Sequence, residues 1–174
     1  MARVRANLIS VYVVRPAGSG VELLLLQRPD DYRFPADWQA VHGHIEEGEP
    51  AWRAAERELA EETGLDAARW WRLSPLESFY NPENDSVYLV PTFLVEVAAG
   101  AEPVLSHEHQ AARWCSLGDA RGRFRWQTQR ASVDAIAVAL KDWPQAGDGL
   151  MELDLDALRA NRRPATASSG SQRE

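Results

Sequence analysis

The sequence predicts an α/β fold in which a mixed β-sheet is covered by helices on both faces. Strand-like apolar runs recur from the N-terminus to residue 117, and two helical segments lie well apart in the chain. Strands that alternate with separated helices pack as layers around one core. Because 45% of the 174 residues are hydrophobic, the chain can bury the core of one domain of ordinary size.

The first half of the chain contains three expected strands. Residues 4–14 alternate at first and then become continuously apolar, as in a strand that enters a core. A Gly- and Pro-containing turn at 16–20 leads into a second apolar strand at 21–28. A proline-containing loop around Asp30 and Asp31 then precedes a third strand at 37–45.

A helix is predicted from about residue 50 to residue 63. Pro50 suits a first helical position, where an N–H has no partner within the helix. Gly64 suits the left-handed residue that ends many helices. At 100° per residue, one stripe of this helix should pack on the sheet, and it comprises Trp52, Ala55, Leu59 and Thr63.

The second half contains strand-like runs at 70–80, 86–97 and 111–117, the first two separated by a turn signal. Pro91 inside the middle run indicates an edge position or a bulge. Residues 126–141 predict an amphipathic helix whose apolar stripe contains Val133, Ile136, Ala137 and Leu140. We expect one domain over residues 1–143. The tail at 144–174 should add at most a loose helical turn or two, and its end should be disordered.

Composition excludes several classes of protein. The net charge of −7 provides no basic surface for duplex nucleic acid or for an anionic membrane. The single cysteine, Cys115, rules out an intrachain disulfide framework. Neither a signal peptide nor an apolar run of membrane-spanning length is expected, so we predict a cytoplasmic protein.

Three carboxylates crowd one side of the first helix. Glu58, Glu61 and Glu62 fall within an arc of about 100°. Like charges at this spacing destabilise a helix, and the negative end of the helix dipole adds to the cost. A solvated surface helix is the alternative explanation. The arrangement favours oxygen ligands for a hard divalent cation, and Mg²⁺ fits best because substrate phosphates and waters complete its shell.

The neighbouring residues strengthen the metal interpretation. The segment 43–65 matches, at every specified position, the motif known as the Nudix box, Gly43-x5-Glu49-x7-Arg57-Glu58-Leu59-x-Glu61-Glu62-x-Gly64-Leu65. The chain therefore resembles the Nudix hydrolases over about residues 4–141. The resemblance implies an α/β/α sandwich with a mixed β-sheet, in which the box forms a loop, a helix and a second loop.

The resemblance also implies an activity and a set of roles. Nudix hydrolases use Mg²⁺, or Mn²⁺ in its place, to attack a phosphorus of a nucleoside diphosphate derivative with water. Transferred to this chain, Glu58, Glu61 and Glu62 would bind metal. The carbonyl of Gly43, or of its neighbour His42, would add a ligand. Glu49 and Arg57 would form an ion pair that fixes the loop against the helix.

Outside the box the sequence is similar to the bacterial dihydroneopterin triphosphate and dATP pyrophosphohydrolase branch. In that branch an "EH" motif supplies a further carboxylate at the metal site, and here it corresponds to Glu108. Glu108 is thus expected to be a metal ligand or the general base, the alternative being an exposed loop residue. Arg28 is a candidate phosphate clamp, and Trp38, Gln39 and Tyr80 are candidates for binding a base or pterin.

The predicted function is hydrolysis of a nucleoside or pterin triphosphate with release of pyrophosphate. Two alternatives remain open at this stage. One is cleavage of a dinucleoside polyphosphate or of an RNA 5′ end, and the other is a non-catalytic module that senses a nucleotide. A zinc site built from the two His-x-His pairs at 42–44 and 107–109 is a further, minor alternative. Either a monomer or a homodimer is compatible with the sequence.

Overall fold

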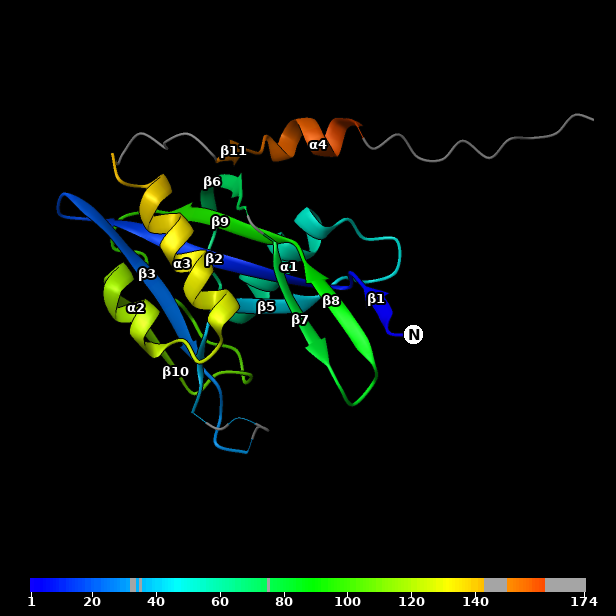
Figure 1. Cartoon of the computed structure of the whole chain (residues 1–174). Helices are drawn as coiled ribbons and strands as arrows, with labels where there is room; N and C mark the ends of the chain where they lie inside the picture. Colours follow the sequence, from blue (N-terminus) through cyan, green and yellow to red (C-terminus); the bar gives the residue numbers. More distant parts are fainter. Residues whose placement is uncertain (32–33, 35, 75, 143–149, 162–174) are drawn as a thin grey trace, which may run out of the picture.

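The computed structural model describes residues 1–31, 34, 36–74, 76–142 and 150–161. Figure 1 shows its elements along the chain. The strands are β1 (Arg3–Arg5), β2 (Leu8–Ala17), β3 (Gly20–Gln27), β4 (Trp38–Gln39), β5 (Val41–His44), β6 (Ala67–Arg72), β7 (Glu77–Asn81), β8 (Ser86–Val90), β9 (Thr92–Val97), β10 (Ala111–Cys115) and β11 (Met151–Glu152). The helices are α1 (Ala51–Thr63), α2 (Leu117–Arg123), α3 (Gln127–Ala139) and α4 (Leu155–Asn161).

The main sheet is mixed, as predicted. Its strands run in the order β10-β3-β2-β9-β6-β11, with β4 paired to β3 and β5 paired to β2. The central pair β2 and β9 is parallel, whereas β3 and β5 are both antiparallel to β2. Each face of this sheet can therefore bury a separate hydrophobic core under its own helices.

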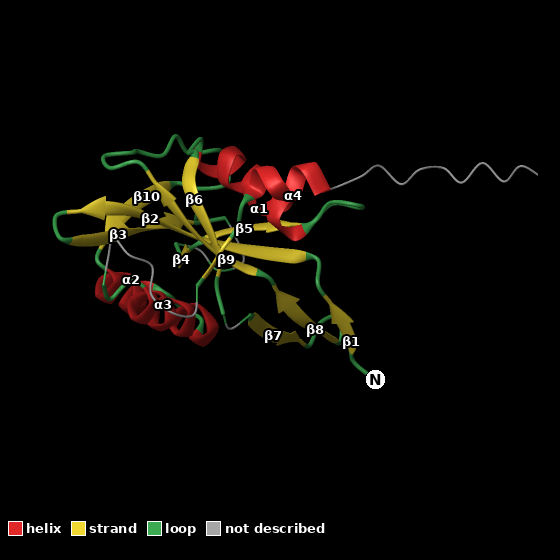
Figure 2. Ribbon diagram, turned by 90° about the horizontal axis from the view of Figure 1, so that it is seen from above, coloured by secondary structure: helices red, strands yellow, loops and turns green. Residues whose placement is uncertain are grey.

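The helices cover the two faces of the main sheet. Helices α1 and α4 lie on one side and α2 and α3 on the other (Figure 2). Under α1, the core contains Ile9, Val11 and Leu59, and under α3 it contains Tyr12, Val133 and Ile136. Neighbouring residues of β2 thus point to opposite cores, since strand side chains alternate between faces. The predicted α/β/α sandwich is confirmed.

A second, small sheet has the order β1-β8-β7. It arises because three of the expected strands are interrupted. The run at 4–14 divides into β1 and β2, the run at 70–80 into β6 and β7, and the run at 86–97 into β8 and β9. Pro91 is the break in the last case, since it has no N–H for the ladder, while its carbonyl accepts from the N–H of Ser10. The chain changes sheets at this proline, which is neither an edge residue of one continuous strand nor a bulge.

The expected third strand at 37–45 also divides, into β4 and β5, which pair with different neighbours. Helix α1 matches its prediction within one residue. Pro50 has extended backbone angles and is the residue before the helix, while Gly64 has a φ of 64° and donates its N–H to Ala60. The predicted inner stripe is confirmed, because Ala55, Leu59 and Thr63 are buried and Trp52 packs against the same core.

The C-terminal half contains the main omissions of the sequence analysis. Helix α2 was not predicted, and in α3 the stripe is displaced, since Ala137 is exposed while Gln129 and Ser132 are buried. Beyond residue 143, β11 pairs with β6, and Leu155 of α4 joins the core under α1. The division of the chain at residue 143 remains a prediction, and residues 162–174 lie outside the described residues. No helix in the described part of the chain is long and apolar enough to cross a membrane.

Candidate active site

Strand β5 supplies the site with backbone groups. It pairs with β2, and Ile45 just after it donates its N–H to Asn7. Because the backbone groups of an antiparallel strand alternate in direction, those of Gly43 face β2 and those of His42 and His44 face away, toward α1. His44 donates its N–H to Oε1 of Glu58 over 3.2 Å, and His42 donates its N–H to the carboxylate of Glu62. The edge of β5 thus holds two carboxylates of the box helix.

The same alternation decides between the two candidate carbonyl ligands. The Gly43 carbonyl is directed into the ladder with β2, whereas the His42 carbonyl faces away from β2, on the edge of β5 whose N–H groups meet Glu58 and Glu62. This orientation favours His42 over Gly43 as the carbonyl that would contact a metal. Gly43 matters for a different reason. A Cβ at this position would lie 2.0 Å from Cδ of Glu58, so any other residue would displace either β5 or the Glu58 carboxylate.

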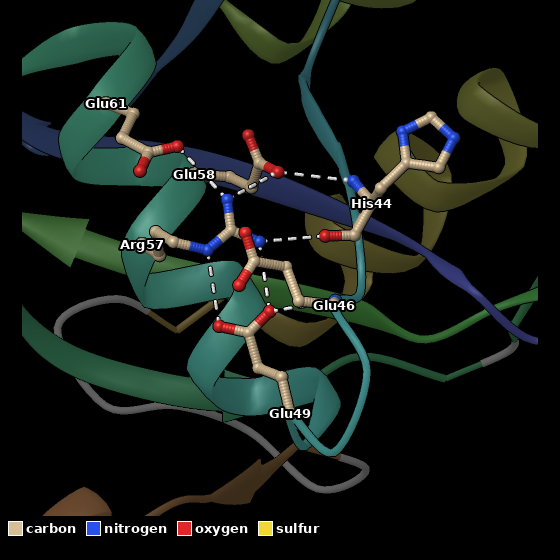
Figure 3. Close-up of polar contacts among 6 residues, drawn as sticks. All are labelled: His44, Glu46, Glu49, Arg57, Glu58 and Glu61. Atoms are coloured by element: carbon tan, nitrogen blue, oxygen red, sulfur yellow. Dashed lines mark hydrogen bonds and ion pairs between the residues drawn. The ribbon is translucent and has the colours of Figure 1, made fainter.

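Arg57 organises the first part of the box (Figure 3). Its guanidinium lies 3.0 Å from Oε2 of Glu49, 2.9 Å from Oε1 of Glu58 and 3.0 Å from Oε2 of Glu61. It also donates to the carbonyl of His44 over 2.8 Å. Hydrogen bonds to Glu49 raise the pKa of Arg57, and those from Arg57 lower the pKa of Glu49. The Glu49–Arg57 pair expected from the motif is therefore present, and it ties loop, helix and β5 together.

Glu62 occupies the inner end of the carboxylate face. It is only 2% exposed, and its Oε2 is buried with no hydrogen-bond partner. Burial raises its pKa to about 9, and the negative charges of Glu58 and Glu108 add to this shift. A carboxylate in this position is costly when charged unless a cation approaches it. The surroundings of Glu62 therefore favour the binding of a cation at its carboxylate.

Glu108 reaches the same site from a distant part of the chain. It is exposed, and its charge acts on the buried carboxylate of Glu62. The loop that carries it is fixed to the end of α1, because Val104 donates to the carbonyl of Thr63 and Ser106 to that of Glu62. This loop therefore comes back to the box helix, as the proposed role of Glu108 requires.

Three further polar side chains, those of Arg28, Gln39 and His109, lie beside Glu62. Arg28 donates through Nε to Oε1 of Gln39 over 2.6 Å, and the Gln39 amide lies 2.9 Å from Nε2 of His109. His109 Nε2 is in turn 3.7 Å from Oε2 of Glu62. Burial lowers the pKa of His109 to about 4, with Arg28 and His42 contributing, so the ring is neutral and can accept from the amide. The sequence pattern suggested His109 only as part of a zinc site. Its link to Gln39 appears only in the fold.

The predicted substrate residues divide into two groups. Arg28 and Gln39 lie next to Glu62, as described. Trp38 points to the other face of the sheet, where Arg113 and Arg123 lie over its ring. Tyr80 is 55% exposed on the β7–β8 hairpin and donates to Asp85 over 2.9 Å. Neither aromatic residue contacts the group around Glu62, so the structure gives no support to their predicted substrate contacts.

The donor atoms fit a divalent cation that takes part of its shell from substrate and water. Among the described residues, no three His, Cys, Asp or Glu side chains are gathered as a metal site by themselves. The fit rests on the unpartnered Oε2 of Glu62, since oxygen donors and incomplete protein shells are typical of Mg²⁺. Glu58 belongs to the same set, because its hydrogen bonds from Arg57 and His44 both use Oε1.

Comparisons with known proteins identify the family of this chain. The model of the NUDIX domain matches residues 5–135. The asymmetrical bis(5′-nucleosyl)-tetraphosphatase of Mus musculus is 33% identical over 120 residues, covering 66% of this chain and 78% of its own. The dihydroneopterin triphosphate diphosphatase of Escherichia coli K12 is 47% identical over 58 residues, covering 33% of this chain and 37% of its own. In a crystal structure, a binary complex of the C. elegans Ap4A hydrolase superposes with a TM-score of 0.68 and 25% identity, covering 80% of this chain and all of the other.

The fold and the box define a pyrophosphohydrolase, and the chain belongs to the Nudix domain family. It acts on a pyrophosphate bond, as its relatives in this family do. The resemblance drawn from residues 43–65 is thereby confirmed, and the relatives include the dihydroneopterin branch that the sequence indicated.

Proposed function

We propose that this protein hydrolyses a nucleoside polyphosphate by attack of water on phosphorus, with Mg²⁺ as its metal and Mn²⁺ able to replace it. The observation that carries the proposal is Glu62, a buried carboxylate with an unpartnered oxygen and two further carboxylates close enough to raise its pKa. Such a group has its charge compensated when a divalent cation binds. A sensing module would have no need of this strained arrangement.

The residues of the site take distinct roles. Glu58, Glu61 and Glu62, with the carbonyl of His42, would hold the metal. When bound, Mg²⁺ neutralises phosphate charge and lowers the pKa of a coordinated water. Arg57 keeps Glu58 and Glu61 in place through the contacts described above. Arg28, which Gln39 orients and which lies beside Glu62, would bind a phosphate of the substrate.

Glu108 is the proposed general base. It would accept one proton from the attacking water while the water oxygen bonds to phosphorus. The bond from phosphorus to the bridging oxygen then breaks, and the electron pair leaves with the phosphate product. An exposed carboxylate on an anchored loop suits this role, since it can meet both water and substrate.

Two substrates are supported by different observations. A dinucleoside tetraphosphate is favoured by relatives that align with about two thirds of this chain and most of their own length, among them the tetraphosphatases of mouse and rat. A nucleoside or pterin triphosphate is favoured by the higher identity of the dihydroneopterin relative over its shorter alignment. We propose the dinucleoside tetraphosphate as the first substrate to test and the triphosphate as the second.

Product analysis distinguishes these substrates. Asymmetric cleavage of a dinucleoside tetraphosphate yields a nucleoside triphosphate and a monophosphate, whereas cleavage of a triphosphate yields a monophosphate and pyrophosphate. Mass spectrometry after reaction in ¹⁸O-labelled water would also locate the attacked phosphorus. We expect turnover that needs added Mg²⁺ or Mn²⁺. Full turnover by metal-free protein in excess EDTA would contradict the proposed function.

A further inference from the structure

A buried polar cluster lies on the face of the main sheet opposite the carboxylates. Its centre is Glu77 at the start of β7, which is only 5% exposed. Tyr12 of β2 and Ser132 of α3 donate to its Oε1, and Ser10 of β2 donates to its Oε2 over 3.2 Å. Burial, followed by the charge of Glu77, raises the pKa of Tyr12, so the phenol remains a donor. Three elements that are distant in sequence, β2, β7 and α3, therefore meet at one carboxylate.

This cluster continues into β5 through the side chain of His42. Oγ of Ser10 lies 2.9 Å from Nε2 of His42, and Oε2 of Glu77 lies 3.9 Å from the same nitrogen. The other ring nitrogen, Nδ1, lies 3.0 Å from the carbonyl oxygen of Ala40, within hydrogen-bond distance. The imidazole is thus held at both nitrogens, and it is not available as part of a zinc site.

His42 connects the two faces of the sheet. Its side chain is fixed on the side of α3, while its N–H donates to Glu62 and its carbonyl faces away from β2 on the same edge of β5. The side chain and the backbone groups of His42 belong to one residue of a short strand. Displacement of the ring would therefore also rotate the β5 backbone at His42. The position of Glu62 would change with it.

A role in positioning its neighbours would explain why a carboxylate is buried at Glu77. Removing a carboxylate charge from water is costly, and well-packed apolar residues in its place are often equally or more stabilising. Glu77 is fully surrounded by donors that fix its position from β2 and α3. A network satisfied in this way specifies one arrangement of its neighbours.

We propose that Glu77, acting through Ser10 and His42, is a positioning residue that holds the β5 backbone against the metal-binding carboxylates. We refer to Glu77, Ser10 and His42 as the β5 brace. The inference rests on the proposed function in one respect, namely that Glu58 and Glu62 bind a divalent metal. The three side chains of the brace lie on the side of α3, and only the backbone of His42 faces the carboxylates of α1.

Two serine variants separate positioning from simple stability. Ser10→Ala removes the link between Glu77 and His42, whereas Ser132→Ala removes an equally buried hydroxyl from the same carboxylate but leaves that link intact. We would titrate Mn²⁺ into each purified protein without substrate, follow binding by electron paramagnetic resonance, and record Tm and the kcat and KM of turnover. Loss of a residue that orients metal ligands typically weakens metal binding or activity about 10- to 100-fold.

The expected result is a loss of Mn²⁺ affinity and kcat by about tenfold or more in Ser10→Ala, with KM little changed. Ser132→Ala should lower Tm by a similar amount but keep Mn²⁺ affinity within about twofold, since only a structural contact is lost. Equal Mn²⁺ affinity in both variants and the wild type would overturn the inference while leaving the proposed function intact. Absence of Mn²⁺ binding by the wild type would instead contradict the proposed function.

A double-mutant cycle covers the case in which Ser10→Ala does not fold. The His42 side chain is 27% exposed, so His42→Ala is the milder change and keeps the backbone N–H and carbonyl. If Glu77 acts through His42, Glu77→Gln and His42→Ala should each weaken Mn²⁺ binding. The Mn²⁺ affinity of the double variant should then be no lower than that of the weaker-binding single variant. Fully additive losses would show that the two residues act independently and would refute the brace.

Discussion

Individual carboxylates of the site have unequal surroundings, although the motif presents them as equivalent. The side chain of Glu61 is 59% exposed and that of Glu58 14%, whereas that of Glu62 is 3% exposed. Burial is the main cause of the raised pKa of Glu62. The inner carboxylate should therefore contribute most to metal binding, because its charge is the least compensated by water or by Arg57.

Glu62→Gln tests this ranking. We expect kcat to fall by at least two orders of magnitude with the fold preserved, since a preorganised charged group is lost from the site. Steady-state kinetics with saturating Mg²⁺, together with circular dichroism, provide the measurement. Glu47→Gln, an exposed residue of the box loop, is the control and should retain kcat within about twofold. Glu56, on the outer side of α1, is a poor control because it pairs with Arg53 and with Arg159 of α4.

Glu108→Gln tests the general base. The expected loss of kcat is about 10²- to 10⁴-fold with little change in KM, which is the usual range for general-base assistance. Glu102 is the matched control, since it is an exposed acidic residue nearby whose partner is Arg15, so Glu102→Gln should have little effect. If Glu108→Gln kept more than about a third of the wild-type kcat, Glu58 and Glu61 would become the candidates for the base.

Between elements, the decisive contact is the approach of β5 to α1. Gly43→Ala would place a Cβ 2.0 Å from Cδ of Glu58, so either the strand or the carboxylate must move. We expect Mn²⁺ affinity and kcat to fall about 10- to 100-fold, as for other changes that displace a metal ligand. Gly20→Ala is the control, because a Cβ there meets nothing within 4 Å and the backbone angle is not restrictive. Titration of Mn²⁺ into both variants measures the difference, and equal affinities would show that β5 adjusts freely.

The elements also show what sequence patterns can and cannot predict. The box helix, its glycine end and the Glu49–Arg57 pair follow from residues close together in the chain, and each could be predicted. The division of the run at 86–97 between two sheets could not be predicted, because a proline between apolar residues is equally compatible with an edge strand or a bulge. Glu77 bonds to residues that lie 55 to 67 positions away in the chain, so no local spacing indicates the cluster. The displaced stripe of α3 has the same origin, since Ser132 is buried by its bond to Glu77 and not by apolarity.

For the molecule as a whole, the main question is where the folded unit ends. Residues 150–161 lie beyond the predicted boundary at 143, yet β11 pairs with β6 and Leu153 donates its N–H to the carbonyl of Trp70. Leu155 is 8% exposed in the core under α1, and Arg159 pairs with Glu56 of the box helix. Helix α4 therefore packs on the outer side of the same helix that carries Glu58, Glu61 and Glu62.

If this segment is integral to the fold, Leu155→Ala should lower the free energy of unfolding by about 2 kcal/mol or more, as truncation of a buried leucine does. Urea unfolding followed by tryptophan fluorescence and by far-UV circular dichroism measures the change, and the two transitions should coincide because the core is shared. Met151→Ala, in the same segment but 50% exposed, should change stability by no more than about 0.5 kcal/mol. A Leu155→Ala protein as stable as the wild type would mean that α4 separates from the core at little cost, and the domain would then end near residue 143 as the sequence suggested.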